Sequence, residues 1–144
     1  MNVARLLATK GANVYTIRPE QVIREAIGML ARHNIGALVV VDESMKPVGI
    51  ISERDIVRRL AKNEDIFGDT ISTIMTKDVI TGVPQDDVKS VAFTMTEKRI
   101  RHLPLVDRGR LIGIVSIGDV LKAQRDQYQG EVDTLQTQIL GDEA

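Results

Sequence analysis

Two short motifs in this sequence pair a serine with an aspartate three residues further on. Ser52 and Asp55 form the first pair and Ser116 and Asp119 the second, each within an apolar stretch that begins with glycine. This spacing is typical of a helix start, where the two side chains cap free backbone amides. A carboxylate at a helix start can also accept hydrogen bonds from both hydroxyls of a cis-diol such as ribose. The motifs therefore predict plain helix caps or ligand sites, and their recurrence in register favours ligand sites.

The two motifs belong to an internal repeat. The offset between the copies is 65 residues as far as a polar turn and 64 residues after it, as a one-residue deletion in that turn would produce. The aligned pairs include Val14 with Val79, Pro19 with Pro84, Ile35 with Ile100, Asp42 with Asp107, and Gly49 with Gly113. Two long copies are typical of a duplication in which equivalent apolar faces bury each other.

Each copy predicts a short strand, a helix, a two-stranded hairpin and a second helix. Apolar residues at helical spacing indicate the first helix of each copy, and continuous apolar runs indicate strands that are covered on both faces. The predicted strands span residues 14–17, 37–41 and 48–51 in the first copy, and 79–83, 103–106 and 111–115 in the second. The second helices begin near Asp55 and Asp119, and a helical turn is expected at residues 71–75.

The polar tail of the chain carries a thin apolar stripe. Val132, Leu135 and Ile139 are spaced like one face of a helix. Such a stripe cannot form a core alone, so the tail is either a frayed helical end or a surface that packs on a partner subunit.

The repeated motifs resemble the signature of the CBS domain family. The likeness is carried by Gly49-Ile-Ile-Ser-Glu-Arg-Asp-Ile56, Gly113-Ile-Val-Ser-Ile-Gly-Asp-Val120, Ile74-Met75-Thr76 and Arg101-His-Leu-Pro-Leu-Val-Asp107. It covers residues 14 to about 123 and implies a stand-alone tandem CBS pair, or Bateman module, of bacterial or archaeal type. The expected fold is α/β, with two β-α-β-β-α repeats packed with pseudo-twofold symmetry. We expect a first repeat at residues 1–75 with the N-terminal segment and linker, a second at 76–124, and a helical tail at 125–144.

The resemblance also implies two clefts between the repeats, each with an aspartate from one repeat and strands from the other. The expected first cleft comprises Ile50, Ser52, Arg54, Asp55, Thr81, Ile100, Arg101 and His102. The expected second cleft comprises Thr16, Ile35, Gly36, Ala37, Ile114, Ser116, Gly118 and Asp119. The aspartates would hold ribose, Ile50 and Ile100 would flank adenine, and the basic residues of the first cleft would face phosphate. The second cleft lacks those basic residues, and we expect weaker phosphate affinity there.

These site assignments have simpler alternatives. Arg54 and Arg101 are also consistent with solvated surface residues, because arginine is mostly exposed in proteins. His102 is also consistent with a packed histidine that has no role.

Composition narrows the class of function. The net charge is -1 and aromatic residues make up 3%, which disfavours phosphate-backbone binding and base stacking, and so nucleic acid. There are no cysteines and only two histidines, far apart, which disfavours a zinc site. The N-terminal segment does not read as a signal peptide, and no apolar run approaches the ~20 residues that cross a bilayer. We therefore expect a cytoplasmic protein without a membrane partner.

The sequence predicts a non-enzymatic regulatory module that senses adenine nucleotides. AMP is the first candidate ligand, with ATP, ADP, NAD and S-adenosylmethionine as others, and no cofactor, metal or catalytic residue is expected. No nucleophile with an adjacent base is visible. The family resemblance implies a homodimer and an unidentified protein target. The alternative is a structural or interaction module that acts through dimerisation and whose clefts are vestigial.

Overall fold

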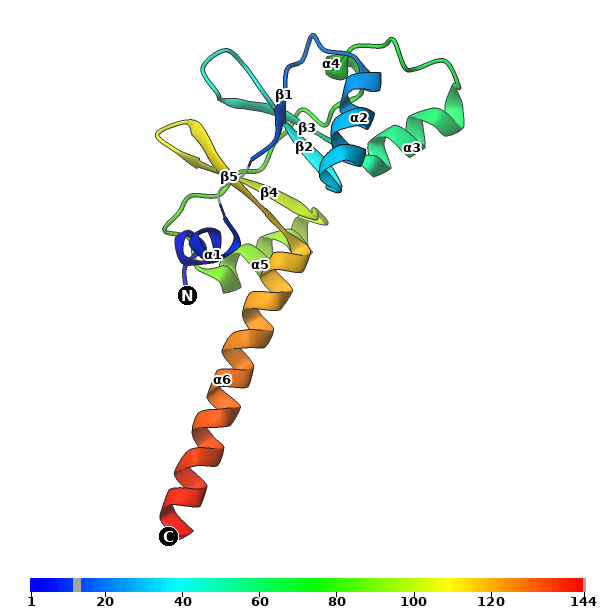
Figure 1. The fold of residues 1–144 in the computed structure, drawn as a ribbon. Helices are drawn as coiled ribbons and strands as arrows, with labels where there is room; N and C mark the ends of the chain where they lie inside the picture. Colours follow the sequence, from blue (N-terminus) through cyan, green and yellow to red (C-terminus); the bar gives the residue numbers. More distant parts are fainter. Residues whose placement is uncertain (12–13, 144) are drawn as a thin grey trace.

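The computed structural model describes residues 1–11 and 14–143, which form two halves and a long projecting helix (Figure 1). The first half contains β1 (Thr16–Ile17), α2 (Ile23–His33), β2 (Ala37–Val41), β3 (Pro47–Ser52), α3 (Glu53–Lys62) and α4 (Ile71–Ile74). The second half contains α1 (Val3–Lys10), α5 (Val88–Lys98), β4 (His102–Asp107), β5 (Arg110–Ser116) and the start of α6 (Ile117–Glu143). The predicted α/β fold of two similar repeats is confirmed.

The first half is built on a three-stranded sheet in the order β1-β2-β3. β1 runs parallel to β2, with Thr16 opposite Val39, and β2 runs antiparallel to β3. Every residue of β2 is buried, as its unbroken apolar sequence predicted. The sheet therefore has covered faces and presents the carboxyl end of β3, at Ser52, to the start of α3.

The second half has a two-stranded sheet of β4 and β5, and the strand predicted at residues 79–83 is reduced to a single bridge. Gly82 pairs in parallel with Leu105, and its amide donates to the Pro104 carbonyl at 2.9 Å. Pro104 has no N–H to donate back on this side, whereas its counterpart in the first copy, Val39, has one. The missing donor explains why this segment pairs over a shorter length than predicted.

The two hairpin turns account for the change in offset between the copies. Val41 lies opposite Pro47 across a five-residue connection, and Val106 lies opposite Leu111 across a connection one residue shorter. Gly109 has φ 78°, a backbone conformation that suits glycine in a tight hairpin. The predicted one-residue deletion therefore lies in the turn.

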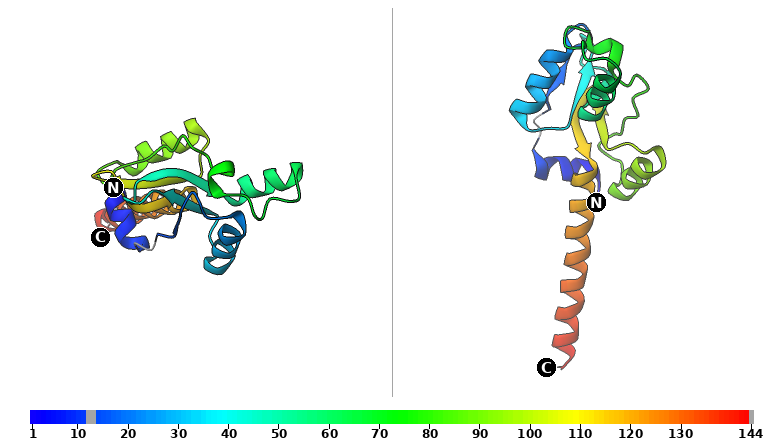
Figure 2. Two further views of the ribbon diagram at one scale, coloured as in Figure 1. Left: turned by 90° about the horizontal axis from the view of Figure 1, so that it is seen from above. Right: turned by 90° about the vertical axis from the view of Figure 1, so that its right-hand side faces the viewer.

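Three apolar clusters form the core, one in each half and one between them. One cluster fills the first half around Ile17, Leu38 and Ile51, and it includes Ile66 and Ile71 of the linker. A second fills the other half around Val91 and Leu105. The third cluster lies between the two sheets. Its buried residues are Val39, Val41 and Leu111, and Val14, Met45 and Ile114 pack against them. The repeats therefore share an interface, and Figure 2 shows their strands layered against each other.

The N-terminal helix α1 packs on the second half of the molecule. Val3 and Leu6 are buried in the second cluster, and the amides of Val3 and Ala4 donate to backbone carbonyls that precede α5. This segment was expected with the first repeat at residues 1–75, and its apolar side chains pack in the core of the second half. Its apolar residues lie outside the 65-residue offset, so the repeat did not predict where they pack.

The predicted tail is the continuation of α6, which runs unbroken from Ile117 to Glu143 and projects from the body (Figures 1 and 2). Leu121, Tyr128 and Leu135 follow one another at seven-residue spacing and are exposed. Ile139 lies outside the residues whose side chains the structure describes. Within the described part of the chain, α6 and the other helices lack the length of apolar sequence that a membrane-spanning helix requires.

Candidate functional site

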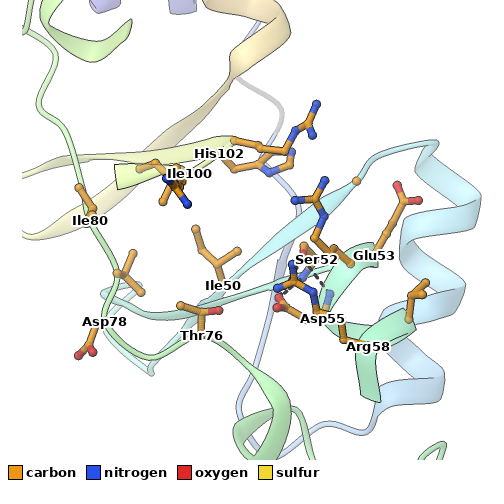
Figure 3. A pocket seen from close by; sticks show the side chains of 16 residues that line it. Ile50, Ser52, Glu53, Asp55, Arg58, Thr76, Asp78, Ile80, Ile100 and His102 are labelled. Carbon is orange, nitrogen blue, oxygen red and sulfur yellow. Dashed lines mark hydrogen bonds between the residues drawn. The ribbon is translucent and has the colours of Figure 1, made fainter. Parts of the chain in front are cut away.

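A pocket of about 890 Å³ opens between the two halves (Figure 3). Its lining comes from the end of β3 and the start of α3 on one side, and from the linker and the start of β4 on the other. This volume is within the range of small-molecule sites. The first cleft is therefore a cavity made by both repeats.

Asp55 lies at the first turn of α3, on one wall of this pocket. Its carboxylate oxygen Oδ2 accepts hydrogen bonds from the Ser52 amide and hydroxyl, both at 2.9 Å, and the Asp55 amide donates to Ser52 Oγ at 3.2 Å. The predicted capping box is thus present. These bonds use one carboxylate oxygen and hold the side chain in place. Among the described residues no hydrogen bond or ion pair engages Oδ1, so that oxygen can accept from a ligand.

Isoleucines form the apolar part of the pocket. Figure 3 shows Ile50 opposite Ile100, with Ile80 beside them. Ile50 is held in place because its amide and carbonyl pair with the backbone of Thr76 at 3.0 and 2.9 Å. Two flat apolar walls with a carboxylate at one end suit a planar ring that carries a hydroxylated group.

The rim of the pocket is rich in arginine. Four arginines line it, namely Arg54, Arg58, Arg99 and Arg101. Glu53 and Asp78 are the acidic lining residues besides Asp55, so arginine is in excess. Guanidinium groups bind phosphate through two parallel hydrogen bonds, which makes this rim suited to a phosphorylated ligand.

Arg58 and Arg99 were missed by the sequence analysis. Arg58 lies one helical turn after Arg54, and this spacing was a signal for it. Arg99 ends α5 with φ 54°, in the left-handed conformation that its counterpart Asn34 also adopts at the end of α2. Only the backbone at this cap brings Arg99 to the pocket, and no pattern of side chains predicts it.

His102 lies where the two halves meet. Burial lowers the pKa of its imidazole, and the positive charges of Lys10 and Arg101 lower that pKa further, while Asp119 and Glu53 oppose them. The histidine is therefore mostly neutral at neutral pH. A ligand phosphate beside it would favour the charged form.

The structure brings together most of the residues expected in the first cleft. Ile50, Ser52, Arg54, Asp55, Ile100, Arg101 and His102 all line the pocket. Thr81 does not, and it is exposed, while Val79 and Ile80 of the same segment line the pocket in its place. Gly36, expected in the second cleft, also lines this pocket and faces Glu53 and His102.

The second Ser-x-x-Asp motif, in the expected second cleft, has the geometry of the first. Ser116 and Asp119 form the same reciprocal hydrogen bonds as Ser52 and Asp55, at 2.9 and 3.1 Å. Of the other residues expected there, Ile35 lines a separate apolar pocket between α2 and α3, and Thr16 and Ala37 lie in the sheet of the first half, opposite Val39 and Ser52. In the residues that the structure describes, no hydrogen bond links them to Asp119.

Lys10, which the sequence analysis did not select, contacts the second aspartate. Its Nζ lies 2.6 Å from Asp119 Oδ2 and donates to the Ile114 carbonyl at 2.8 Å. Burial alone would raise the pKa of Asp119, but the hydrogen bonds from Lys10 and Ser116 outweigh it and the pKa lies below its ordinary value. Asp119 is therefore ionised and already paired.

The acidic residues and histidines were compared with the arrangement that a metal ion needs. Among the side chains that the structure describes, in residues 1–11 and 14–137, no group of three or more His, Cys, Asp or Glu is placed to hold an ion. The polar groups of the pocket are thus arranged around a carboxylate and arginines, which suits an organic phosphate rather than a bare cation.

Comparison with known proteins gives consistent matches. The model of the CBS domain family matches residues 4–62 and 71–126. A CBS-domain containing protein from Agrobacterium tumefaciens is 40% identical with a TM-score of 0.81, over 86% of this chain and 99% of that one. The CBS domain pair of protein MJ0100, solved with 5'-methylthioadenosine and S-adenosyl-L-methionine, is 35% identical with a TM-score of 0.79, over 88% and 98%. A CBS domain protein from Pyrobaculum aerophilum complexed with AMP is 30% identical with a TM-score of 0.75, over 83% and 89%.

Proposed function

This chain belongs to the CBS domain family, and from that premise we propose that it is a non-enzymatic regulatory module that binds an adenine nucleotide in the first cleft. The observation that carries the proposal is the composition of that cleft. One pocket combines isoleucine walls, a carboxylate with a free oxygen and an arginine rim. These three features correspond to the base, the ribose and the phosphate of a nucleotide.

Each part of the ligand has a matching group in the pocket. Ile50 and Ile100 would lie on the two faces of adenine, where burial of apolar surface favours a flat ring. Asp55 would accept hydrogen bonds from the ribose hydroxyls, since a charged acceptor forms the stronger bond. Arg54 and Arg101 would bind phosphate, with Arg58 and Arg99 extending the same rim.

AMP is our first candidate among the adenine compounds. The relative from Pyrobaculum aerophilum was solved with AMP, and MJ0100 was solved with 5'-methylthioadenosine and S-adenosyl-L-methionine. These ligands share adenosine and differ beyond the 5' carbon. The arginines would contact the part of the ligand beyond the 5' carbon, and their positive charge favours a phosphate there over an uncharged or sulfonium group.

We further propose that the module works as a homodimer in the cytoplasm and reports the nucleotide to a protein target. Apolar side chains on the helices support an association between copies: Val57 is 63%, Phe93 67% and Leu121 58% exposed. The apolar pocket between α2 and α3 adds to this surface. Binding between two halves would shift the angle between them, which is how a ligand without chemistry can be sensed.

A thermal-shift panel tests the proposal. The compounds are AMP, ADP, ATP, NAD, S-adenosylmethionine and GTP, each with the wild-type protein and Asp55→Asn. A ligand at about 100 times its Kd stabilises the fold by about 2.7 kcal/mol, or roughly 8 °C for a chain of this size. We expect shifts with adenine compounds, reduced in Asp55→Asn. No shift with any of them would favour the structural alternative with vestigial clefts.

A further inference from the structure

The N-terminal helix α1 occupies, in the second half, the place that the linker occupies in the first. Leu7 packs against Gly113, where a Cβ would lie 2.6 Å from its methyl group, and Met75 packs in the same way against Gly49. These glycines are repeat partners. A shift of 68 positions therefore relates α1 to the segment that begins at Ile71, and it was hidden because it differs from the 65-residue offset.

Counting on by the same 68 positions relates Lys10 to Asp78. Asp78 lines the first cleft, so this count sets an acid against a base, although α4 ends at Ile74 whereas α1 runs on to Lys10. A second carboxylate cannot neutralise Asp55. The two aspartates thus differ in their charged neighbours, because Lys10 bonds to Asp119 whereas no basic side chain forms an ion pair with Asp55 in the described residues.

Lys10 occupies two acceptors of the expected second cleft, the carboxylate of Asp119 and the carbonyl of Ile114. Its ammonium bonds to Asp119 at 2.6 Å and to the Ile114 carbonyl at 2.8 Å. Ile50 is the repeat counterpart of Ile114 in the first cleft, and its carbonyl accepts from the backbone amide of Thr76. In the described residues, no ion pair involves Asp55. The Lys10 and Asp119 side chains are 32% and 24% exposed, so the pair is partly shielded from water.

The body of α1 holds Lys10 in this place. Val3 and Leu6 are 0% and 4% exposed in the second core, and the amides of Val3 and Ala4 bond to carbonyls of the second half at 2.9 and 3.0 Å. The helix continues without a break to Lys10. Lys10 is therefore presented by an anchored element rather than by a free terminus.

We infer that Lys10 is a specificity-determining residue that closes the second cleft to ribose, so that each chain takes a single nucleotide, in the first cleft. The inference rests on the proposed function. A diol could reach Asp119 only by displacing a charge-assisted bond and leaving both the ammonium and the Ile114 carbonyl without partners.

Calorimetric titration with AMP tests this inference on the full chain. We expect the wild type to bind one AMP per chain and Lys10→Met to bind two, because methionine keeps the apolar stem and removes the charge. The second site should gain about 10- to 100-fold in affinity, the range of one charge-assisted hydrogen bond. Lys77→Met is the matched control: Lys77 is exposed beside the first cleft, and its loss should leave one site.

Each stoichiometry decides between the inference and the proposed function. One AMP in both the wild type and Lys10→Met overturns the inference alone, and two in the wild type does the same. None in the wild type and one in Lys10→Met overturns the assignment of the first cleft and supports the role of Lys10. None in either protein, with both folded by circular dichroism, overturns the two together.

Discussion

Replacement of Asp55 by asparagine separates the two roles of this residue, helix cap and ligand acceptor. In the structure Oδ2 takes both bonds from Ser52, so the capping box uses one side of the carboxylate. Asparagine has the same size and can still accept with its carbonyl oxygen. The substitution therefore removes the charge and one acceptor while the pocket keeps its shape.

The expected loss follows from the number and kind of bonds. A hydrogen bond to a charged group contributes about 1.5 to 3 kcal/mol, and one between neutral groups about 0.5 to 1.5 kcal/mol. With two ribose hydroxyls on the carboxylate, the difference is about 1 to 3 kcal/mol, so the Kd for AMP should rise about 5- to 150-fold. The weakened cap should cost about 1 kcal/mol at most, or about 3 °C in Tm.

The assay is calorimetric titration of wild type and Asp55→Asn with AMP, together with thermal unfolding in the absence of ligand. Asp87→Asn is the matched control, because Asp87 caps α5 by accepting from the Lys89 amide at 3.1 Å and lies outside the pocket. It should lose a similar stability and keep its affinity. If Asp55→Asn melts lower and binds AMP as tightly as this control, Asp55 is a cap alone and our account of the first cleft is wrong.

Two further predictions concern the basic residues of the first cleft. Arg101→Ala should weaken AMP binding about 10- to 100-fold and adenosine binding less than about threefold, because only AMP carries the phosphate that arginine binds. The assay is calorimetric titration, with the exposed Arg32→Ala as the control. Equal losses of affinity for AMP and adenosine would contradict the phosphate assignment. The pKa of His102 is lowered below its ordinary value of 6.5, chiefly by burial. The unfolded chain therefore binds a proton at this histidine more readily than the folded chain does. The folded state should lose stability as the pH falls from about 7 to 5. Urea unfolding at these two pH values should show a smaller loss of unfolding free energy in His102→Gln than in the wild type, with His33→Gln as the control. An equal loss in His102→Gln and the wild type would show that His102 is not the source of the pH dependence.

The repeat made much of this structure predictable. Residues aligned at fixed offsets report the same local environment twice, so the hairpins and the Ser-x-x-Asp caps were placed correctly. The helix after each strand followed from apolar spacing, and Leu30 and Met95 are buried as expected. The two copies thus served as two related sequences, and a pattern present in both was a safer basis for prediction than a pattern present in one.

What escaped prediction depends on contacts between distant residues. Lys10 and Asp119 are 109 positions apart, and no local pattern joins them. The shortened strand at Gly82 depends on the missing amide of Pro104 in another strand. Thr81 was expected in the first cleft from the family resemblance, but Val79 and Ile80 line the pocket instead, in a segment that pairs with β4 through a single bridge.

The length of α6 gives the second half a lever arm. The helix begins beside Ser116 and Asp119 and extends over 27 residues, about 40 Å at the usual rise per residue. A tilt of about 10° at this fulcrum would carry the far end through about 7 Å, by the same helix geometry. A displacement at the start of α6 that is too small to alter the core would therefore move its C-terminal end by several times as much. A protein bound at that end would then respond to a change at Asp119 without contacting the cleft.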